Sequence, residues 1–77
     1  MNKIRRKNLE QLIEQLEVVR STLDDLKGEE EECLLNLPEN LMGSDRYQSM
    51  DDAVDALDEA LDEIENAIGD IQTAIES

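Results

Sequence analysis

Carboxylates are the residues of this sequence whose chemistry stands out. The 77 residues include 21 Asp or Glu, 7 Lys or Arg and no His, so the formal charge is −14. Carboxylates serve as general acids and bases, as metal ligands, or as a surface that attracts basic partners. The first two uses need a desolvated pocket or several groups converging on one point. Because there is no His, no glycine-rich phosphate loop and no calcium-binding loop, we expect no enzyme activity, no cofactor and no metal site.

Five carboxylates in the C-terminal half are spaced to form one row along a helix. They follow one another at steps of four and three: Asp51, Asp55, Asp58, Asp62 and Glu65. Residues 24–77 carry 2 basic and 18 acidic side chains, whereas residues 1–23 carry 5 basic and 3 acidic ones. Like charges at these spacings cost roughly 0.2–0.5 kcal/mol per pair, and folding does not require them. We therefore predict that the row binds a basic surface of a partner protein, together with Glu29, Glu31 and Glu32.

Two interpretations of this charge remain open. In the first, the carboxylates are a solvated face that keeps a small bundle in solution. In the second, they meet a basic surface of a partner, of which a surface that normally holds nucleic acid is a special case. One hairpin would carry one net charge per ~3.6 Å, and a dimer would double this to about the one per ~1.7 Å of duplex DNA. A basic cluster near the N-terminus is too short to bind nucleic acid directly, and we expect it to lie beside Asp70 and Glu76. Its members are Lys3, Arg5, Arg6 and Lys7.

Apolar residues recur at alternating steps of three and four in two segments. In the first segment these positions are Leu9, Leu12, Leu16, Val19, Leu23, Leu26, Glu30, Cys33 and Leu37, of which only Glu30 is charged. In the second they are Tyr47, Met50, Val54, Leu57, Leu61, Ile64, Ile68, Ile71 and Ile75. Heptads with filled a and d positions are typical of helices that pack as coiled coils. Pro38, Gly43 and Ser44 lie between the segments and indicate a turn followed by a helix N-cap.

These signals predict an all-α fold, an antiparallel coiled-coil-like hairpin that forms a single domain over residues 1–77. We expect the first helix at about 3–36, the turn at about 37–44 and the second helix at about 45–76, with Ser49 as an alternative cap. No apolar run approaches the ~18 residues of a membrane span, and no apolar signal core follows the basic N-terminal residues. We therefore expect a soluble, cytoplasmic protein that does not contact membranes.

An alanine column predicts contact with a second copy of the chain. Ala53, Ala60, Ala67 and Ala74 recur every seven residues and widen the apolar face of the second helix. A chain this short, with one Cys and no His, has no disulfide or metal to supplement its core, so a partner chain is expected. We predict a homodimer that forms a four-helix bundle through this column. The alternative is a monomeric hairpin in which the column is exposed.

Two positions near the turn have no single interpretation. Glu30 occupies an a position, where it is either buried as a determinant of register or partner, or marks fraying of the heptads. Cys33 occupies the following d position and is expected to act as a small apolar residue. A disulfide between copies is the alternative for Cys33.

The turn and its flanks resemble a family of small acidic helical-hairpin proteins encoded by phages, prophages and mobile elements of Firmicutes. The resemblance lies in residues 36–41, residues 43–47, the basic N-terminal stretch and the Glu29–Glu32 run. It implies a phage or mobile-element context and carries over no functional residue. Small acidic proteins of that context are often inhibitors of host defence enzymes, so we expect a counter-defence inhibitor or DNA mimic that binds a host protein. The alternative is a scaffolding module that binds a partner helix through its apolar seam.

Overall fold

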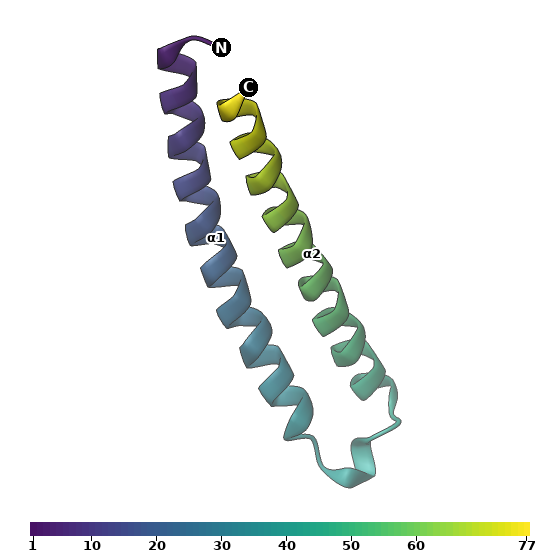
Figure 1. Ribbon diagram of the computed structural model, residues 1–77. Coiled ribbons are helices and arrows are strands. Elements are labelled where there is room, and N and C mark those ends of the chain that lie inside the picture. The colour runs from purple at the N-terminus through teal and green to yellow at the C-terminus, as the bar shows by residue number, and fades with distance from the viewer.

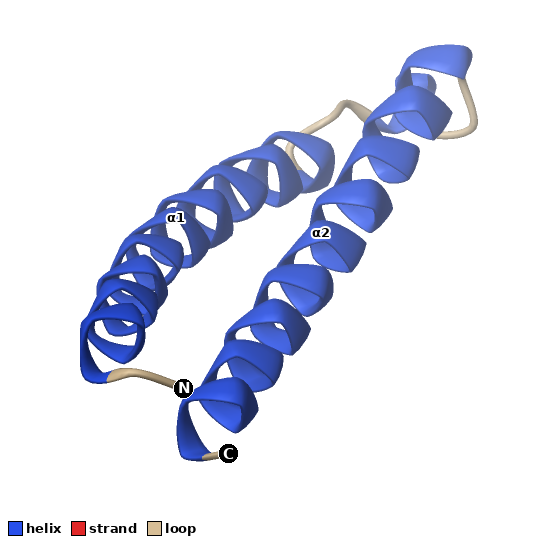
Figure 2. Ribbon diagram, turned by 90° about the horizontal axis from the view of Figure 1, so that it is seen from above, coloured by secondary structure: helices blue, strands red, loops and turns tan.

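Two long antiparallel helices make up the computed structural model, which describes residues 1–77. Helix α1 spans Lys3–Leu35 and helix α2 spans Asp45–Glu76, in agreement with the expected ranges to within one residue. A short 3₁₀ helix, η1 (Glu39–Leu41), lies between them. The helices lie side by side along their length, with both termini at one end and the turn at the other (Figure 1, Figure 2). The rod has Cα extents of 59 × 16 × 12 Å. The expected all-helical hairpin is confirmed.

A side-chain cap begins each helix. The Asn2 side-chain oxygen accepts a hydrogen bond from the Arg5 backbone N–H at 2.7 Å, and Ser44 Oγ accepts one from the Tyr47 N–H at 3.2 Å. These bonds satisfy amide groups that the first turn of a helix leaves without partners. The alternative cap, Ser49, lies inside α2, so the second helix begins at the earlier signal.

The turn combines a 3₁₀ helix with one left-handed residue. Pro38 precedes η1, and its carbonyl accepts the Leu41 N–H at 2.9 Å. Gly43 follows with a φ of +88°, in the region that glycine enters without steric cost. The Ser44 N–H then donates to the Leu41 carbonyl at 3.1 Å, which closes the turn and sets the cap of α2 in place.

Two glycines are expected to respond in opposite directions to replacement by alanine. Gly43→Ala forces a Cβ into left-handed backbone and should destabilise the protein by about 1 kcal/mol. Gly28→Ala lies within α1, where a Cβ meets nothing within 4 Å, and should stabilise it by about 0.5–1 kcal/mol. Thermal unfolding followed by circular dichroism measures both changes. Stabilisation by Gly43→Ala would contradict the left-handed turn.

The second helix contacts the first through the residues predicted for it. Leu61 and Ile68 are buried, and the other seven members of its predicted seam are partly buried. The adjoining alanine column, residues 53, 60, 67 and 74, is also partly buried. This helix therefore presents an apolar stripe three positions wide per heptad.

The first helix is rotated relative to its predicted seam. Four predicted seam residues are exposed, namely Leu12 (46%), Val19 (50%), Leu26 (51%) and Cys33. The residues that follow each of them take their places beside α2: Ile13, Arg20, Lys27 and Leu34. The sequence-based assignment was wrong at these four positions of the hairpin. Two of the replacements are as apolar as the predicted residues, and the two basic ones have aliphatic stems that cover the seam while their charged ends reach water.

The core is one side chain thick. Only Ile13, Leu61 and Ile68 are buried among the 77 residues. Two helices enclose a single layer of side chains between them, so every layer has water on both flanks. The hairpin therefore buries little apolar surface for its length.

Candidate functional site

The seam divides the long sides of the hairpin into two faces of different chemistry. Leu26 and Lys27 are neighbours in α1, yet Lys27 forms an ion pair with Asp58 of α2, whereas Leu26 lines a groove together with Ala53 and Leu57. Successive helical residues project about 100° apart, so these contacts lie on opposite sides of the seam. We call the side of Lys27 and Asp58 the acidic face and the side of Leu26 and Ala53 the apolar face.

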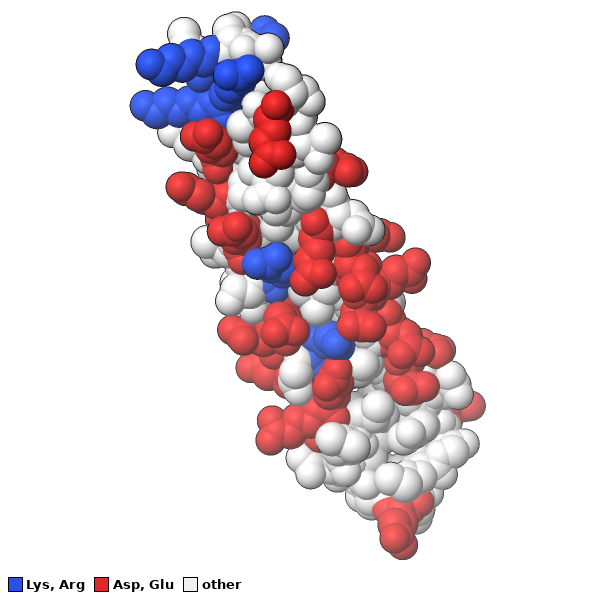
Figure 3. Space-filling model, viewed as in Figure 1, with Lys and Arg blue, Asp and Glu red and all other residues white.

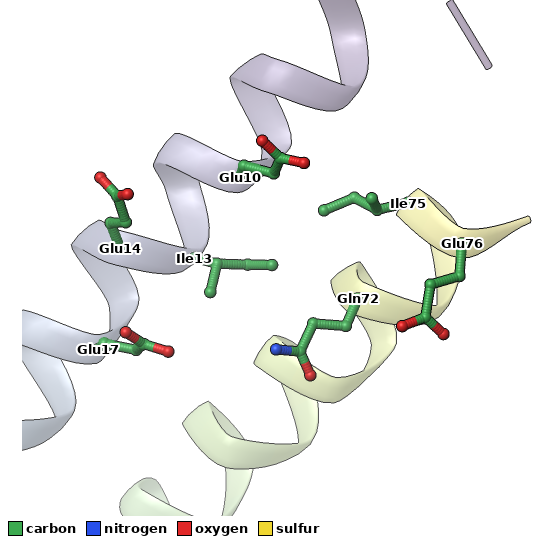
Figure 4. Close-up of a pocket in the computed structure, with 7 residues that line it drawn as sticks. All are labelled: Glu10, Ile13, Glu14, Glu17, Gln72, Ile75 and Glu76. Atoms are coloured by element: carbon green, nitrogen blue, oxygen red, sulfur yellow. The ribbon is translucent and has the colours of Figure 1, made fainter. Parts of the chain in front are cut away.

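The acidic face carries carboxylates from both helices. One shallow groove on it joins Glu10, Glu14 and Glu17 of α1 to Glu76 of α2, and a second joins Glu17, Arg20 and Asp24 to Glu65. Figure 4 shows the first groove, in which Ile13 and Ile75 point toward one another between the helices. The carboxylates form the rim and the isoleucines form the floor. This face presents negative charge along most of the rod.

The contribution of α1 to the acidic face was not predicted. Its carboxylates repeat every seven residues beside the seam: Glu10, Glu17, Asp24 and Glu31. A spacing of seven places residues on one side of a helix that packs through heptads. The signal was therefore present in the sequence. It was hidden because residues 1–23 carry a net positive charge, and four of their five basic residues lie at 3–7.

Lys27 forms both ion pairs of the acidic face. Its Nζ lies 2.7 Å from Asp58 Oδ1 across the seam and 3.3 Å from Glu31 Oε1 one turn along α1. The hydrogen bond to Asp58 is the main reason that the pKa of Lys27 is raised above its usual value of 10.5. Lys27 therefore stays charged and links the two helices on a side where carboxylates predominate.

The structure brings the predicted binding row to the acidic face and its outer edge. Asp58 meets Lys27, and Glu65 borders the second groove. Asp55 and Asp62 are exposed farther from the seam, and Asp51 is partly buried. The row is thus continuous, with one of its members already engaged by a cation of the hairpin.

The structure divides the Glu29–Glu32 run between the two faces. Glu31 pairs with Lys27 on the acidic face, whereas Glu29 and Glu30 line the groove on the apolar face. Glu32 is exposed. Helix α1 continues without a break through Glu30 to Leu35, and Glu30 itself is partly buried. The run does not extend the acidic row as one surface, because neighbours in a helix project in different directions.

The apolar face leaves several large apolar side chains partly exposed. Leu26 and Cys33 of α1 and Ala53, Ala56 and Leu57 of α2 line a groove on it. Farther along α1, a hollow is lined mainly by Val18, Val19, Leu23 and Leu26. Three of its large side chains, at positions 12, 19 and 26, are about half exposed. This face has the composition of an interface and has no cover in a single chain.

The basic cluster lies at the end of the rod where the two termini meet. Figure 3 shows most of the visible Lys and Arg gathered at that end, whereas Asp and Glu predominate along the rest of the visible face, with two basic side chains among them near the middle. Arg6 Nη2 donates to the backbone oxygen of Ser77 at 3.5 Å. The only ion pairs in the hairpin are those of Lys27, so Asp70 and Glu76 do not pair with the cluster.

No group of three or more His, Cys, Asp or Glu side chains is placed to hold a metal ion. Neither helix combines the length and the apolar character that crossing a membrane requires. Comparisons with protein-family models, curated proteins and solved structures gave no match.

Proposed function

We propose that the chain is a non-enzymatic interaction protein that binds a basic surface of another protein and blocks it. The observation that carries this proposal is the acidic face, where carboxylates of both helices surround only two cations, Arg20 and Lys27. A surface selected only for solubility would intersperse both signs. A one-sided face instead attracts a basic partner and accelerates the encounter.

The density of charge supports a target surface that normally holds nucleic acid. A net charge of −14 over a rod 59 Å long is about one charge per 4 Å, and a dimer of similar length carries roughly one per 2 Å. Duplex DNA carries one per ~1.7 Å. With the resemblance at the turn, this favours a phage or mobile-element protein that inhibits a nucleic-acid-binding host protein in the cytoplasm.

We also propose that the working form is a homodimeric four-helix bundle. The support is the contrast between a core of three buried residues and an apolar face that one chain leaves open. Sedimentation equilibrium at micromolar concentration should give twice the 8.8 kDa of one chain. A fully helical monomer under these conditions would rule out the bundle.

Neutralising the same number of carboxylates inside and outside the acidic row tests whether the row is the binding surface. In the test variant, the five acidic-row residues become amides: Asp51, Asp55, Asp58, Asp62 and Glu65. In the control variant, five carboxylates away from both faces become amides: Asp25, Asp52, Glu59, Glu63 and Asp70. Both variants have a net charge of −9 instead of −14. The readout is the amount of each protein that tagged bait retains from a lysate of a Firmicute host at 0.1 M NaCl.

The expected result is a host protein whose retention falls at least about tenfold with the test variant and less than about threefold with the control. Binding should also disappear near 0.5 M NaCl, where the Debye length is only about 4 Å. Equal losses from the two variants would show that total charge, and no particular face, governs binding. Helicity of each bait is checked by circular dichroism, so that an unfolded variant is not mistaken for a binding defect.

A second candidate function follows from the apolar face. The half-exposed side chains at 12, 19 and 26 would also suit a scaffolding module that binds the apolar stripe of a partner helix. Such binding depends on apolar burial, so it would persist at 0.5 M NaCl and would be insensitive to the amide variants. The salt series therefore separates the two functions.

A further inference from the structure

We infer that two copies pack apolar face to apolar face with their turns at opposite ends. In this arrangement Val19 lies beside Val19 of the second copy, and Arg5 of each copy lies near Glu29 of the other. The inference rests on the dimer proposed above and adds its interface, its orientation and its register. It replaces an interface made of the alanine column alone.

A single row on α1 defines the centre of the interface. Five residues spaced by seven follow one another along it: Arg5, Leu12, Val19, Leu26 and Cys33. Its three aliphatic members are 46–51% exposed, in a chain that buries only three residues. The alanine column of α2 belongs to the same face, since Ala53 lines a groove with Leu26 and Cys33. Small side chains there allow a second pair of helices to approach closely.

Charges determine which way the second copy points. No side chain of the basic cluster has an ion-pair partner in the hairpin, and neither do Glu29, Glu30 and Glu32. The two groups are about 25 residues apart in one unbroken helix, or about 37 Å, so they cannot meet within one chain. If two α1 helices lie antiparallel across the interface, Arg5, the cluster member in this row, meets Glu29 of the other copy.

The heptad row also sets the register. A two-fold axis at Val19 places Leu12 opposite Leu26 of the second copy, because the paired numbers then add to 38. The same axis places Arg5 opposite Cys33, whose neighbour along the groove is Glu29. Apolar residues meet at the centre of the interface, and opposite charges meet at both of its ends. Such self-complementarity is what a two-fold interface requires.

Placing both turns at the same end loses this complementarity. Helix α1 would then face α2 of the second copy, and Glu29 would lie opposite the stretch of α2 that gives Ala53, Ala56 and Leu57 to the apolar face. Those residues carry no charge, so Glu29 would have no basic partner there. The opposite orientation supplies one.

Cysteine crosslinking tests the register directly. Wild-type Cys33 is exposed, but in the proposed dimer the two Cys33 residues lie about 40 Å apart, too far for a disulfide. Val19→Cys in a Cys33→Ser background places two thiols beside the axis. Mild oxidation with copper phenanthroline should link most of this variant as a dimer, about tenfold more than wild type on a non-reducing gel.

Ser21→Cys in the same Cys33→Ser background is the matched control. Position 21 is exposed and lines a groove on the acidic face, so this thiol should give no more dimer than wild type. A protein that sediments as a dimer but does not crosslink through Val19→Cys would overturn the arrangement while leaving the proposed dimer intact. A monomer in sedimentation would overturn both.

A charge exchange tests the orientation without cysteine chemistry. Arg5→Glu alone and Glu29→Arg alone should each raise the dimer dissociation constant at least about fivefold in 0.1 M NaCl. Combining them should bring it back to within about twofold of wild type, because the exchanged charges again face one another. Additive losses in the double variant would contradict the orientation. Full helicity in each variant, measured at high protein concentration, confirms that folding is intact.

Discussion

Ile68→Ala is expected to lower the free energy of unfolding by about 2–3 kcal/mol, the largest effect of a single substitution in this hairpin. Ile68 is 6% exposed, less than any other residue. The change removes three methyl or methylene groups from a seam only one side chain thick, and the two helices can close only part of the space. Because a domain of this size has few kilocalories of stability, most of its margin would be lost.

Thermal unfolding measures this loss as a drop of roughly 10–20 °C in the midpoint. Ile4→Ala is the matched control, since it makes the same chemical change in α1 at a residue that is 76% exposed. The control should shift the stability by less than about 0.5 kcal/mol. Equal shifts for the two variants would mean that the seam does not hold the helices together.

Replacing Asp55 and Asp62 by lysine is expected to stabilise the free protein by about 1–2 kcal/mol. Each of these exposed residues has carboxylates three and four positions away in α2. Lysine converts the repulsive pairs into attractive ones, and it also has a higher helix propensity than aspartate. The same double variant should lose partner binding, because it reverses charge in the middle of the acidic row.

Salt dependence distinguishes this explanation from a change in packing. The rise in melting temperature should be largest at 10 mM NaCl and should shrink by more than half at 0.5 M, where exposed charges are screened. The corresponding double asparagine variant removes the repulsion without adding attraction, so it should show a smaller gain. Destabilisation by the lysines at low salt would mean that these carboxylates support the fold.

If the double lysine variant is more stable than the wild type but no longer binds the partner, the acidic row lowers stability and is needed for binding. Residues kept at a cost to stability are usually kept for function. In α2, ten carboxylates and no base follow Tyr47, which is more repulsion than helix formation calls for. The acidic row would then be the part of the chain selected for its partner.

Local signals in the sequence determine the helices and the turn, and the structure differs mainly in how α1 is rotated about its axis. In α2 the residue that follows each apolar d position is charged or an amide, so only one rotation fills the seam. The d positions are Met50, Leu57, Ile64 and Ile71, and the residues that follow them are Asp51, Asp58, Glu65 and Gln72. In α1 both neighbours of the a row are able to cover the seam, as Leu12 and Ile13 illustrate. The apolar pattern of α1 alone does not choose between them, and packing against α2 does.

The same rotation explains why only the α2 part of the acidic face could be predicted from the sequence. The acidic row of α2 was predictable because a run of like charges at steps of four and three needs no partner helix to be recognised. The carboxylates of α1 join it only because α1 presents its Glu17 side to that face. For the same reason Glu29 and Glu31, two residues apart, belong to different surfaces.

The single-layer core also fixes how the stability of one hairpin varies with temperature. Heat capacity rises on unfolding in proportion to the apolar surface that becomes hydrated, at about 12–15 cal/mol/K per residue in ordinary domains. With Ile13, Leu61 and Ile68 as its only buried side chains, a single hairpin exposes far less new apolar surface. Its stability curve is therefore shallow and its thermal transition broad. The proposed second copy on the apolar face would steepen that curve, and calorimetry would then register association as an increase in heat capacity change with protein concentration.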